Sequence, residues 1–103
     1  MDLDLAGRRA LVTGSSSGIG AGIAAELAAE GALVVVHGRN ADRANAVAAQ
    51  ITEAGGKAAV ALGDLSTNEG AASVAEQALA AFGGIDILVN NACLLYTSPS
   101  PRD

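Results

Sequence analysis

A glycine-rich segment near the amino terminus has the residue types and spacing of a phosphate-binding turn. It reads Thr13-Gly14-Ser15-Ser16-Ser17-Gly18-Ile19-Gly20. Glycines let the backbone turn sharply and approach a ligand closely, while serines supply hydroxyl and N–H donors. Where such a turn opens a helix, unpaired N–H groups and the positive end of the helix dipole attract an anion. The segment predicts a site for a dinucleotide pyrophosphate, and an ordinary turn without a ligand is the alternative.

The elements beside this turn must place it between a buried strand and a helix. The apolar residues before the turn predict a strand over 9–13. The residues after it predict a helix that ends near Gly31. The stripe expected to face the core of this helix consists of Ile19, Ile23, Leu27 and Ala28.

Further strand and helix patterns alternate along the rest of the chain. Strands are expected over 33–37, 58–62 and 85–90. Asn40 is expected to cap the second helix, and Ser66 to open a capping box with Glu69 before the third. Paired glycines follow each of these helices. The expected buried positions are Ala44, Val47, Ala48 and Ile51 in the second helix, and Ala71, Val74, Ala75, Ala78, Leu79 and Phe82 in the third.

Strands separated by helices of this length predict right-handed crossovers and a parallel sheet. The expected fold is α/β, a Rossmann-like doubly wound parallel sheet of strand order 3-2-1-4, truncated after the fourth strand. Residues 1–92 would form the N-terminal part of a dinucleotide-binding domain. Because parallel strands end at one edge of a sheet, the residues that follow each strand should meet there, beside the ligand.

The end of the second expected strand indicates which dinucleotide is preferred. An acidic side chain there would bind the ribose 2′-OH of NAD, whereas this chain has Gly38 followed by Arg39. A guanidinium can meet a 2′-phosphate through a bidentate, charge-assisted hydrogen bond. The sequence therefore predicts NADP(H) in preference to NAD, with a solvated loop arginine as the alternative. Asp42 is assigned to the first turn of the next helix.

Composition and charge exclude several classes of function. The net charge is −5 and the basic residues are scattered, so no nucleic-acid partner is expected. No apolar run approaches the roughly 20 residues that span a bilayer, and no secretory signal is evident, so a cytoplasmic protein without a membrane partner is expected. His37, the only histidine, has no metal-ligand spacing around it. We assign it to a structural position or the rim of the site, and expect no metal site.

The last residues, 93–103, differ from everything before them. They have no apolar period and closely resemble the conceptual translation of a transposase-type sequencing adapter. We interpret them as a read-through tail outside the fold. The alternative is a natural C-terminus rich in proline and serine.

With the glycine segment followed by Asp64 and by Asn90-Asn91-Ala92, the chain resembles the short-chain dehydrogenase/reductase family from about Leu5 to Ala92. The resemblance implies that Asp64 contacts the adenine ring and that Leu65 lines the pocket beside it. It also implies that Asn91 approaches the cofactor while Asn90 braces the sheet. The alternatives are that Asp64 only stabilises the turn before Ser66 and that both asparagines are structural. The family's third motif ends in glycine, where this chain has Cys93.

The same resemblance implies an NADP(H)-dependent oxidoreductase. Such an enzyme moves a hydride between the nicotinamide and a small carbonyl or alcohol substrate, and the full-length protein would be a homo-oligomer. The family's catalytic Ser, Tyr-x-x-x-Lys and Asn lie further along the chain, and none can be placed here. Tyr96 has Ser100 where the lysine would be needed. Alternatives are a non-catalytic dinucleotide sensor on the same fold, or an isolated polypeptide without activity.

Overall fold

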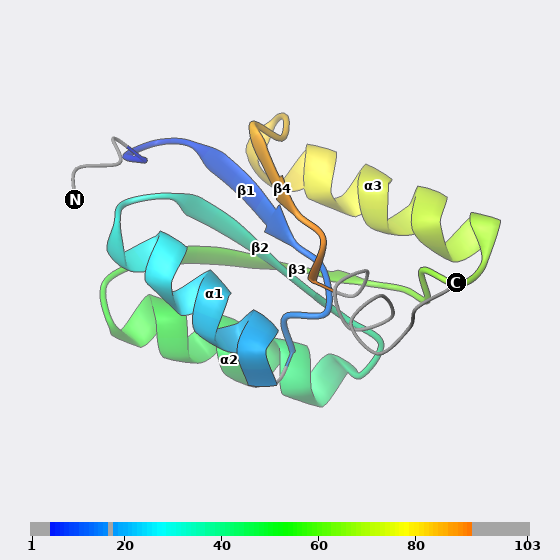
Figure 1. Cartoon of the computed structure of the whole chain (residues 1–103), viewed down its shortest axis with the longest axis horizontal. Helices are drawn as coiled ribbons and strands as arrows, with labels where there is room; N and C mark the ends of the chain where they lie inside the picture. The colour runs from blue at the N-terminus through cyan, green and yellow to red at the C-terminus, as the bar shows by residue number, and fades with distance from the viewer. Residues whose placement is uncertain (1–4, 17, 92–103) are drawn as a thin grey trace, which may run out of the picture.

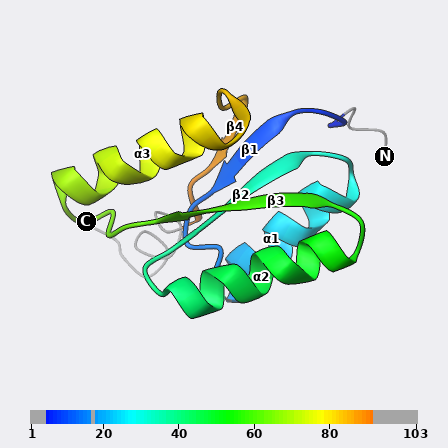
Figure 2. The same cartoon turned by 180° about the vertical axis from the view of Figure 1, so that it is seen from behind.

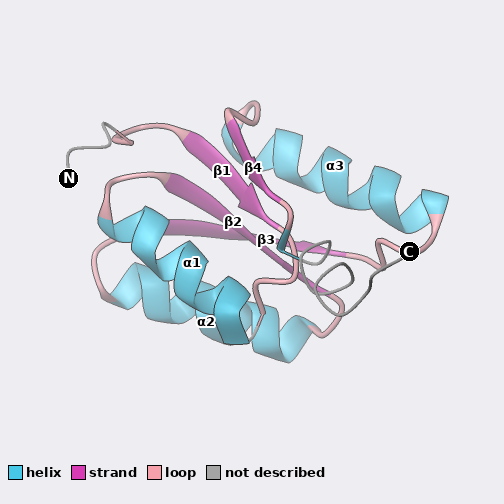
Figure 3. Cartoon of the chain, in the orientation of Figure 1, coloured by secondary structure: helices cyan, strands magenta, loops and turns pink. Residues whose placement is uncertain are grey.

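Four parallel strands form one sheet in the order β3-β2-β1-β4, which confirms the predicted topology (Figure 1). The computed structural model describes residues 5–16 and 18–91; Ser17 and the expected tail at 93–103 lie outside this range. Figure 3 marks the helices and strands. Their bounds are β1 Arg9–Val12, α1 Gly18–Ala29, β2 Leu33–Gly38, α2 Ala41–Glu53, β3 Lys57–Leu62, α3 Asn68–Phe82 and β4 Ile87–Val89.

The helices cover the two faces of the sheet unequally. The helices α1 and α2 lie on one face and α3 lies on the other, as the two opposite views show (Figures 1 and 2). In the register of the strands, Val12 lies beside Val36 and Val89, and Val36 lies beside Val60. Because all four strands run in the same direction, their carboxyl ends meet at a single edge.

The strand β2 is buried on both faces, as its run of β-branched residues predicts. Successive side chains of a strand point to opposite faces. Val34 and Val36 therefore pack toward α1 and α2, whereas Val35 packs toward α3. His37 continues this alternation and belongs to the face that α3 covers.

The predicted buried face of α1 is confirmed at Ala28 and in part at Ile23 and Leu27, which pack against the core, but it is wrong at Ile19. Gly20, Ala24 and Ala28 are buried, while Ile23 and Leu27 are only partly buried and Ile19 is 69% exposed. The prediction followed the large apolar residues. The structure instead places the smallest residues at i, i+4 and i+8 against the sheet, because these allow the helix backbone to approach closely.

The helix ends agree with the sequence at α2 and differ at α3. The side chain of Asn40 accepts a hydrogen bond from the Arg43 N–H at 3.0 Å, which confirms the expected cap. At α3 the cap is Thr67, whose hydroxyl accepts from the Gly70 N–H at 2.9 Å. The predicted box beginning at Ser66 is wrong by one residue, because Ser66 is hydrogen-bonded to Asp64 instead.

The buried face of α3 is also narrower than predicted. Val74 and Ala78 are buried, but Ala75 is exposed and Leu79 is 50% exposed. The helix packs mainly on β3 and more lightly on β2, so only a narrow face of it lies against the sheet. It ends as expected at Gly83, whose φ of 82° is a left-handed conformation suited to glycine.

The amino edge of the sheet is closed by an ion pair between β1 and the residue before β4. The Arg9 guanidinium donates two hydrogen bonds of 2.9 Å to the Asp86 carboxylate. These bonds and the Arg9 N–H hold the pKa of Asp86 well below its usual range. The Asp86 N–H also donates to the Arg9 carbonyl at 2.7 Å, and β4 begins at the next residue, Ile87. No helix in the described part of the chain is long and apolar enough to cross a membrane.

Candidate functional site

The carboxyl edge of the sheet brings together the glycine turn and the residues after β2, β3 and β4. The Asn91 side-chain N–H donates to the Gly14 carbonyl at 3.3 Å. The Gly63 N–H donates to the Gly38 carbonyl at 3.2 Å. Beside them, Arg39 Nη1 lies 3.9 Å from Asp64 Oδ2. The described members of the predicted site therefore share one edge.

The first part of the turn is fixed to strands β1 and β2 by hydrogen bonds of Ser15. Ser15 is fully buried, its N–H donates to the His37 carbonyl at 2.8 Å, and its hydroxyl donates to the Val12 carbonyl at 2.6 Å. The same hydroxyl accepts from the His37 N–H at 2.8 Å. These hydrogen bonds use both polar groups that Ser15 could offer a pyrophosphate. Ser15 therefore shapes the turn, and the donors free to meet an anion begin at Ser16.

The second part of the turn opens α1. The first N–H groups of a helix have no partner within the helix, and here they belong to Gly18, Ile19 and Gly20. Gly14 and Gly18 have φ of 63° and 61°, which glycine adopts at least cost. A Cβ on Gly20 would overlap the Gly14 carbonyl oxygen and lie 2.8 Å from Asn91 Nδ2. The absence of a side chain at Gly20 thus lets the helix start lie on the end of β1.

The end of β2 has no room for a side chain before Arg39. A Cβ on Gly38 would lie 2.6 Å from both Cβ and Oγ of Ser16. Any acidic residue at that position would push the turn away. Arg39 comes next, and its side chain is 76% exposed. The first side chain that β2 offers to a ligand is therefore a cation.

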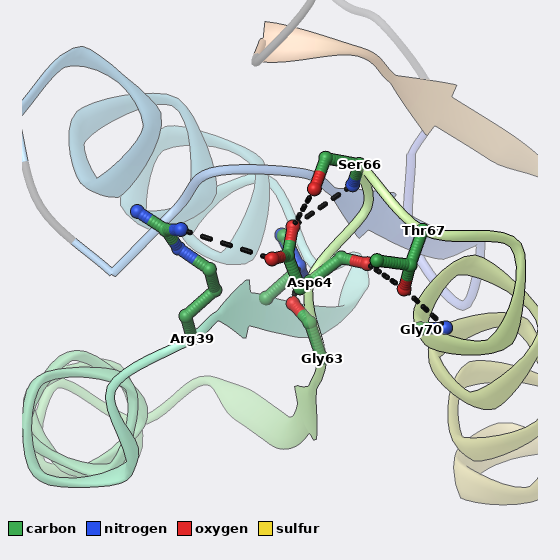
Figure 4. Close-up of polar contacts among 7 residues, drawn as sticks. Arg39, Gly63, Asp64, Ser66, Thr67 and Gly70 are labelled. Atoms are coloured by element: carbon green, nitrogen blue, oxygen red, sulfur yellow. Dashed lines mark hydrogen bonds and ion pairs between the residues drawn. The ribbon is translucent and has the colours of Figure 1, made fainter.

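Asp64 uses one carboxylate oxygen for a local turn and turns the other toward Arg39 (Figure 4). Its Oδ1 accepts from the Ser66 hydroxyl at 2.7 Å and from the Ser66 N–H at 2.9 Å. These bonds, with a smaller contribution from the charge of Arg39, hold the pKa of Asp64 below its usual range. Leu65 is partly buried and packs against the core below α3. The turn-stabilising role left open for Asp64 is present in the structure.

Two further residues support this edge. His37 is buried, and its ring joins the Gly14 N–H to the Gly63 carbonyl. The sequence assigned it to a structural position or the rim of the site, and its burial and backbone contacts agree with the structural assignment. Asn90 accepts from the Thr13 hydroxyl at 3.1 Å, so it joins β4 to β1, which fits the bracing expected of it.

The groups at this edge are suited to binding an anion. The edge combines helix-start N–H groups, an exposed guanidinium and a carboxylate, and the described residues contain no group of His, Cys, Asp and Glu that could hold a metal ion. A groove of about 210 Å³ lies elsewhere, between α1 and α2. Its lining is mainly apolar, half of it alanine, and it includes no charged side chain.

Comparisons with known proteins agree with this geometry. The sequence model of the family described as short chain dehydrogenase matches residues 8–102. The chain is 44% identical over 100 residues to a 3beta-hydroxysteroid dehydrogenase 1 of Eggerthella lenta, covering 96% of this chain and 38% of that protein. The chain thus spans well under half the length of this curated relative.

Two solved structures are similar in fold as well as in sequence. L-sorbose reductase from Gluconobacter frateurii, complexed with NADPH and L-sorbose, has a TM-score of 0.84 and 43% identity over 88% of this chain and 35% of its own. A 7alpha-hydroxysteroid dehydrogenase complexed with NADH and 7-oxo glycochenodeoxycholic acid has a TM-score of 0.81 and 41% identity. That match covers 84% of this chain and 34% of the dehydrogenase.

The contact between Gly20 and Gly14 yields a test with a matched control in the same helix. Gly20→Ala should destabilise the chain by about 2–3 kcal/mol, because the new methyl group overlaps backbone. Gly22→Ala meets nothing within 4 Å and should stabilise the helix by about 0.5–1 kcal/mol. Urea denaturation followed by circular dichroism measures both. Equal midpoints for the two variants would contradict the close approach of α1 to β1.

Proposed function

The chain belongs to the short-chain dehydrogenase family, and we propose that it is the NADP(H)-binding part of an oxidoreductase. The observation that carries the proposal is the position of Arg39 at the same edge as the glycine turn. In the whole protein, hydride would pass between the nicotinamide and a carbonyl or alcohol carbon. The cofactor supplies that chemistry, and this chain's residues bind and orient it.

The preference for NADP(H) rests on what surrounds the end of β2. Gly38 leaves no carboxylate to bind a ribose 2′-OH or repel a 2′-phosphate. Among residues 5–16 and 18–91, the one ion pair that Arg39 makes is an exposed contact of 3.9 Å with Asp64, and such surface pairs are weak. A 2′-phosphate can therefore replace Asp64 as its partner. Similar proteins have been solved with NADPH and with NADH, so the shared fold alone does not select the cofactor. We therefore base the preference for NADP(H) on Gly38 and Arg39.

The remaining contacts follow from the geometry of the turn and from the family. The pyrophosphate would lie over Ser16, Ser17 and the helix start, whose residues are Gly18, Ile19 and Gly20. We place the adenine near Asp64 and Leu65, after β3. Asn91 would act on the cofactor chiefly by fixing the Gly14 carbonyl, to which it donates.

We propose that catalysis requires residues beyond those of this chain, because no family catalytic set can be placed in its sequence. The substrate would be a small carbonyl or alcohol compound, the class to which the steroid and sorbose substrates named for its relatives belong. The whole protein would act as a homo-oligomer. A non-catalytic dinucleotide sensor on the same fold remains the second candidate, and a Tyr-x-x-x-Lys motif in the whole protein would decide against it.

The role of Arg39 is tested by comparing two dinucleotides in the full-length protein. Arg39→Ala should weaken NADP+ binding roughly 10- to 100-fold, because a charge-assisted hydrogen bond to the 2′-phosphate is lost. Binding of NAD+, which has no such phosphate, should change little. Arg43→Ala, in the first turn of α2, is the matched control and should leave both affinities near wild type. Unchanged NADP+ binding in Arg39→Ala would rule the role out.

The activity of the isolated chain is a separate prediction. It should be marginally stable and turn over no substrate. The strand β4 is an edge of the described sheet, and Leu88 on it is 60% exposed. Thermal melts with and without NADP(H), together with NADPH oxidation assays over simple carbonyl compounds, measure both properties. Robust turnover by the isolated chain would defeat the prediction.

A further inference from the structure

The imidazole of His37 joins two parts of the proposed binding edge through its two nitrogens. His37 is 5% exposed and lies at the end of β2. Its Nδ1 lies 2.8 Å from the Gly14 nitrogen, and its Nε2 lies 2.9 Å from the Gly63 carbonyl oxygen. A backbone N–H can only donate and a carbonyl can only accept. Both bonds therefore require a neutral imidazole with its proton on Nε2.

The two backbone groups that His37 joins belong to different parts of the site. Gly14 begins the phosphate turn, and its carbonyl lies against Gly20 and Asn91. Gly63 comes directly before Asp64, which faces Arg39. The ring thus spans the gap between the pyrophosphate side and the adenine–ribose side.

We propose that His37 is a positioning residue whose neutral imidazole holds the phosphate turn in its binding geometry, and whose protonation releases the turn and weakens dinucleotide binding. The proposal rests on the proposed function. An imidazolium carries N–H groups on both nitrogens. At 2.8 Å, its Nδ1–H would face the Gly14 N–H, and two donors cannot share that distance. Gly14 must then move away, and the anion-binding amides that follow it move too.

The charged groups around His37 do not offer the ring a compensating partner. The charged residue that follows its own strand is Arg39, and the one that follows β3 is Asp64, which is engaged by Ser66 and Arg39. On α3 the acidic residues are Glu69 and Glu76, both exposed. The end of β1 with the turn up to Ser16, and the end of β4 through Asn91, carry no charged side chain. The two hydrogen-bond partners of the His37 ring, the Gly14 N–H and the Gly63 carbonyl, are both backbone groups.

Calorimetric titration of the full-length protein at pH 8 and pH 5.5 tests the effect on binding. Wild-type affinity for NAD+ should be lower at pH 5.5 than at pH 8, because an imidazolium cannot accept the hydrogen bond from the Gly14 N–H. His37→Asn keeps an acceptor near Nδ1 without a titrating ring, so its affinity should change less than about twofold. NAD+ is the main probe because the 2′-phosphate of NADP+ itself titrates near these pH values. Parallel pH profiles for wild type and His37→Asn would overturn the proposal.

A measurement without cofactor separates this proposal from the proposed function. In the full-length protein with ¹⁵N-labelled histidine, the pair of ring signals that is absent from His37→Asn belongs to His37. At pH 8 these should report a bare Nδ1 and a protonated Nε2, and the Gly14 amide signal should shift as the ring titrates. A protonated Nδ1 at pH 8 would overturn the proposed positioning role of His37. So would a Gly14 amide signal that stays constant while the ring titrates. If no dinucleotide binds at pH 8, the proposed function fails while these signals still decide the role of His37.

Discussion

The close approach of α1 to the carboxyl end of β1 is the constraint on which the rest of the structure depends. Gly20 meets the Gly14 carbonyl with no space for a methyl group, and Ala24 and Ala28 continue the same narrow contact along the sheet. A larger residue at any of these points would lift the helix away. The helix start would then leave the strand ends, and its N–H groups would no longer face a ligand held there.

A second constraint is that buried polar groups at this edge must find partners within the protein. Ser15, His37 and Asn91 are all buried, and each is hydrogen-bonded to backbone of a neighbouring segment. An unpaired buried polar group is costly, so these hydrogen bonds favour one arrangement of the strand ends. The same bonds that satisfy these groups also decide which amides remain for an anion. At the opposite edge, the Arg9 and Asp86 pair fixes β1 against β4 without offering a site.

The sequence predicted the architecture well because its signals are local. Strand and helix alternation gave the parallel sheet and its order, and the cap at Asn40 lies within one turn of helix. The predicted burial of Ile19 was wrong because apolar periodicity favours large residues, whereas small residues lie where α1 approaches the sheet most closely. The cap at Ser66 was wrong because Asp64 competes for the same groups. The bridging role of His37 depends on segments distant in sequence, which periodicity does not describe.

The central claim is that a dinucleotide lies across the helix start of α1 and the end of β2. The most direct measurement is the change in amide chemical shifts of the ¹⁵N-labelled chain with millimolar NADP+, a method suited to weak binding. The account predicts the largest changes at Ser16, Gly18, Gly20 and Arg39. Changes confined to the groove between α1 and α2, or no change at any residue of the carboxyl edge, would contradict it.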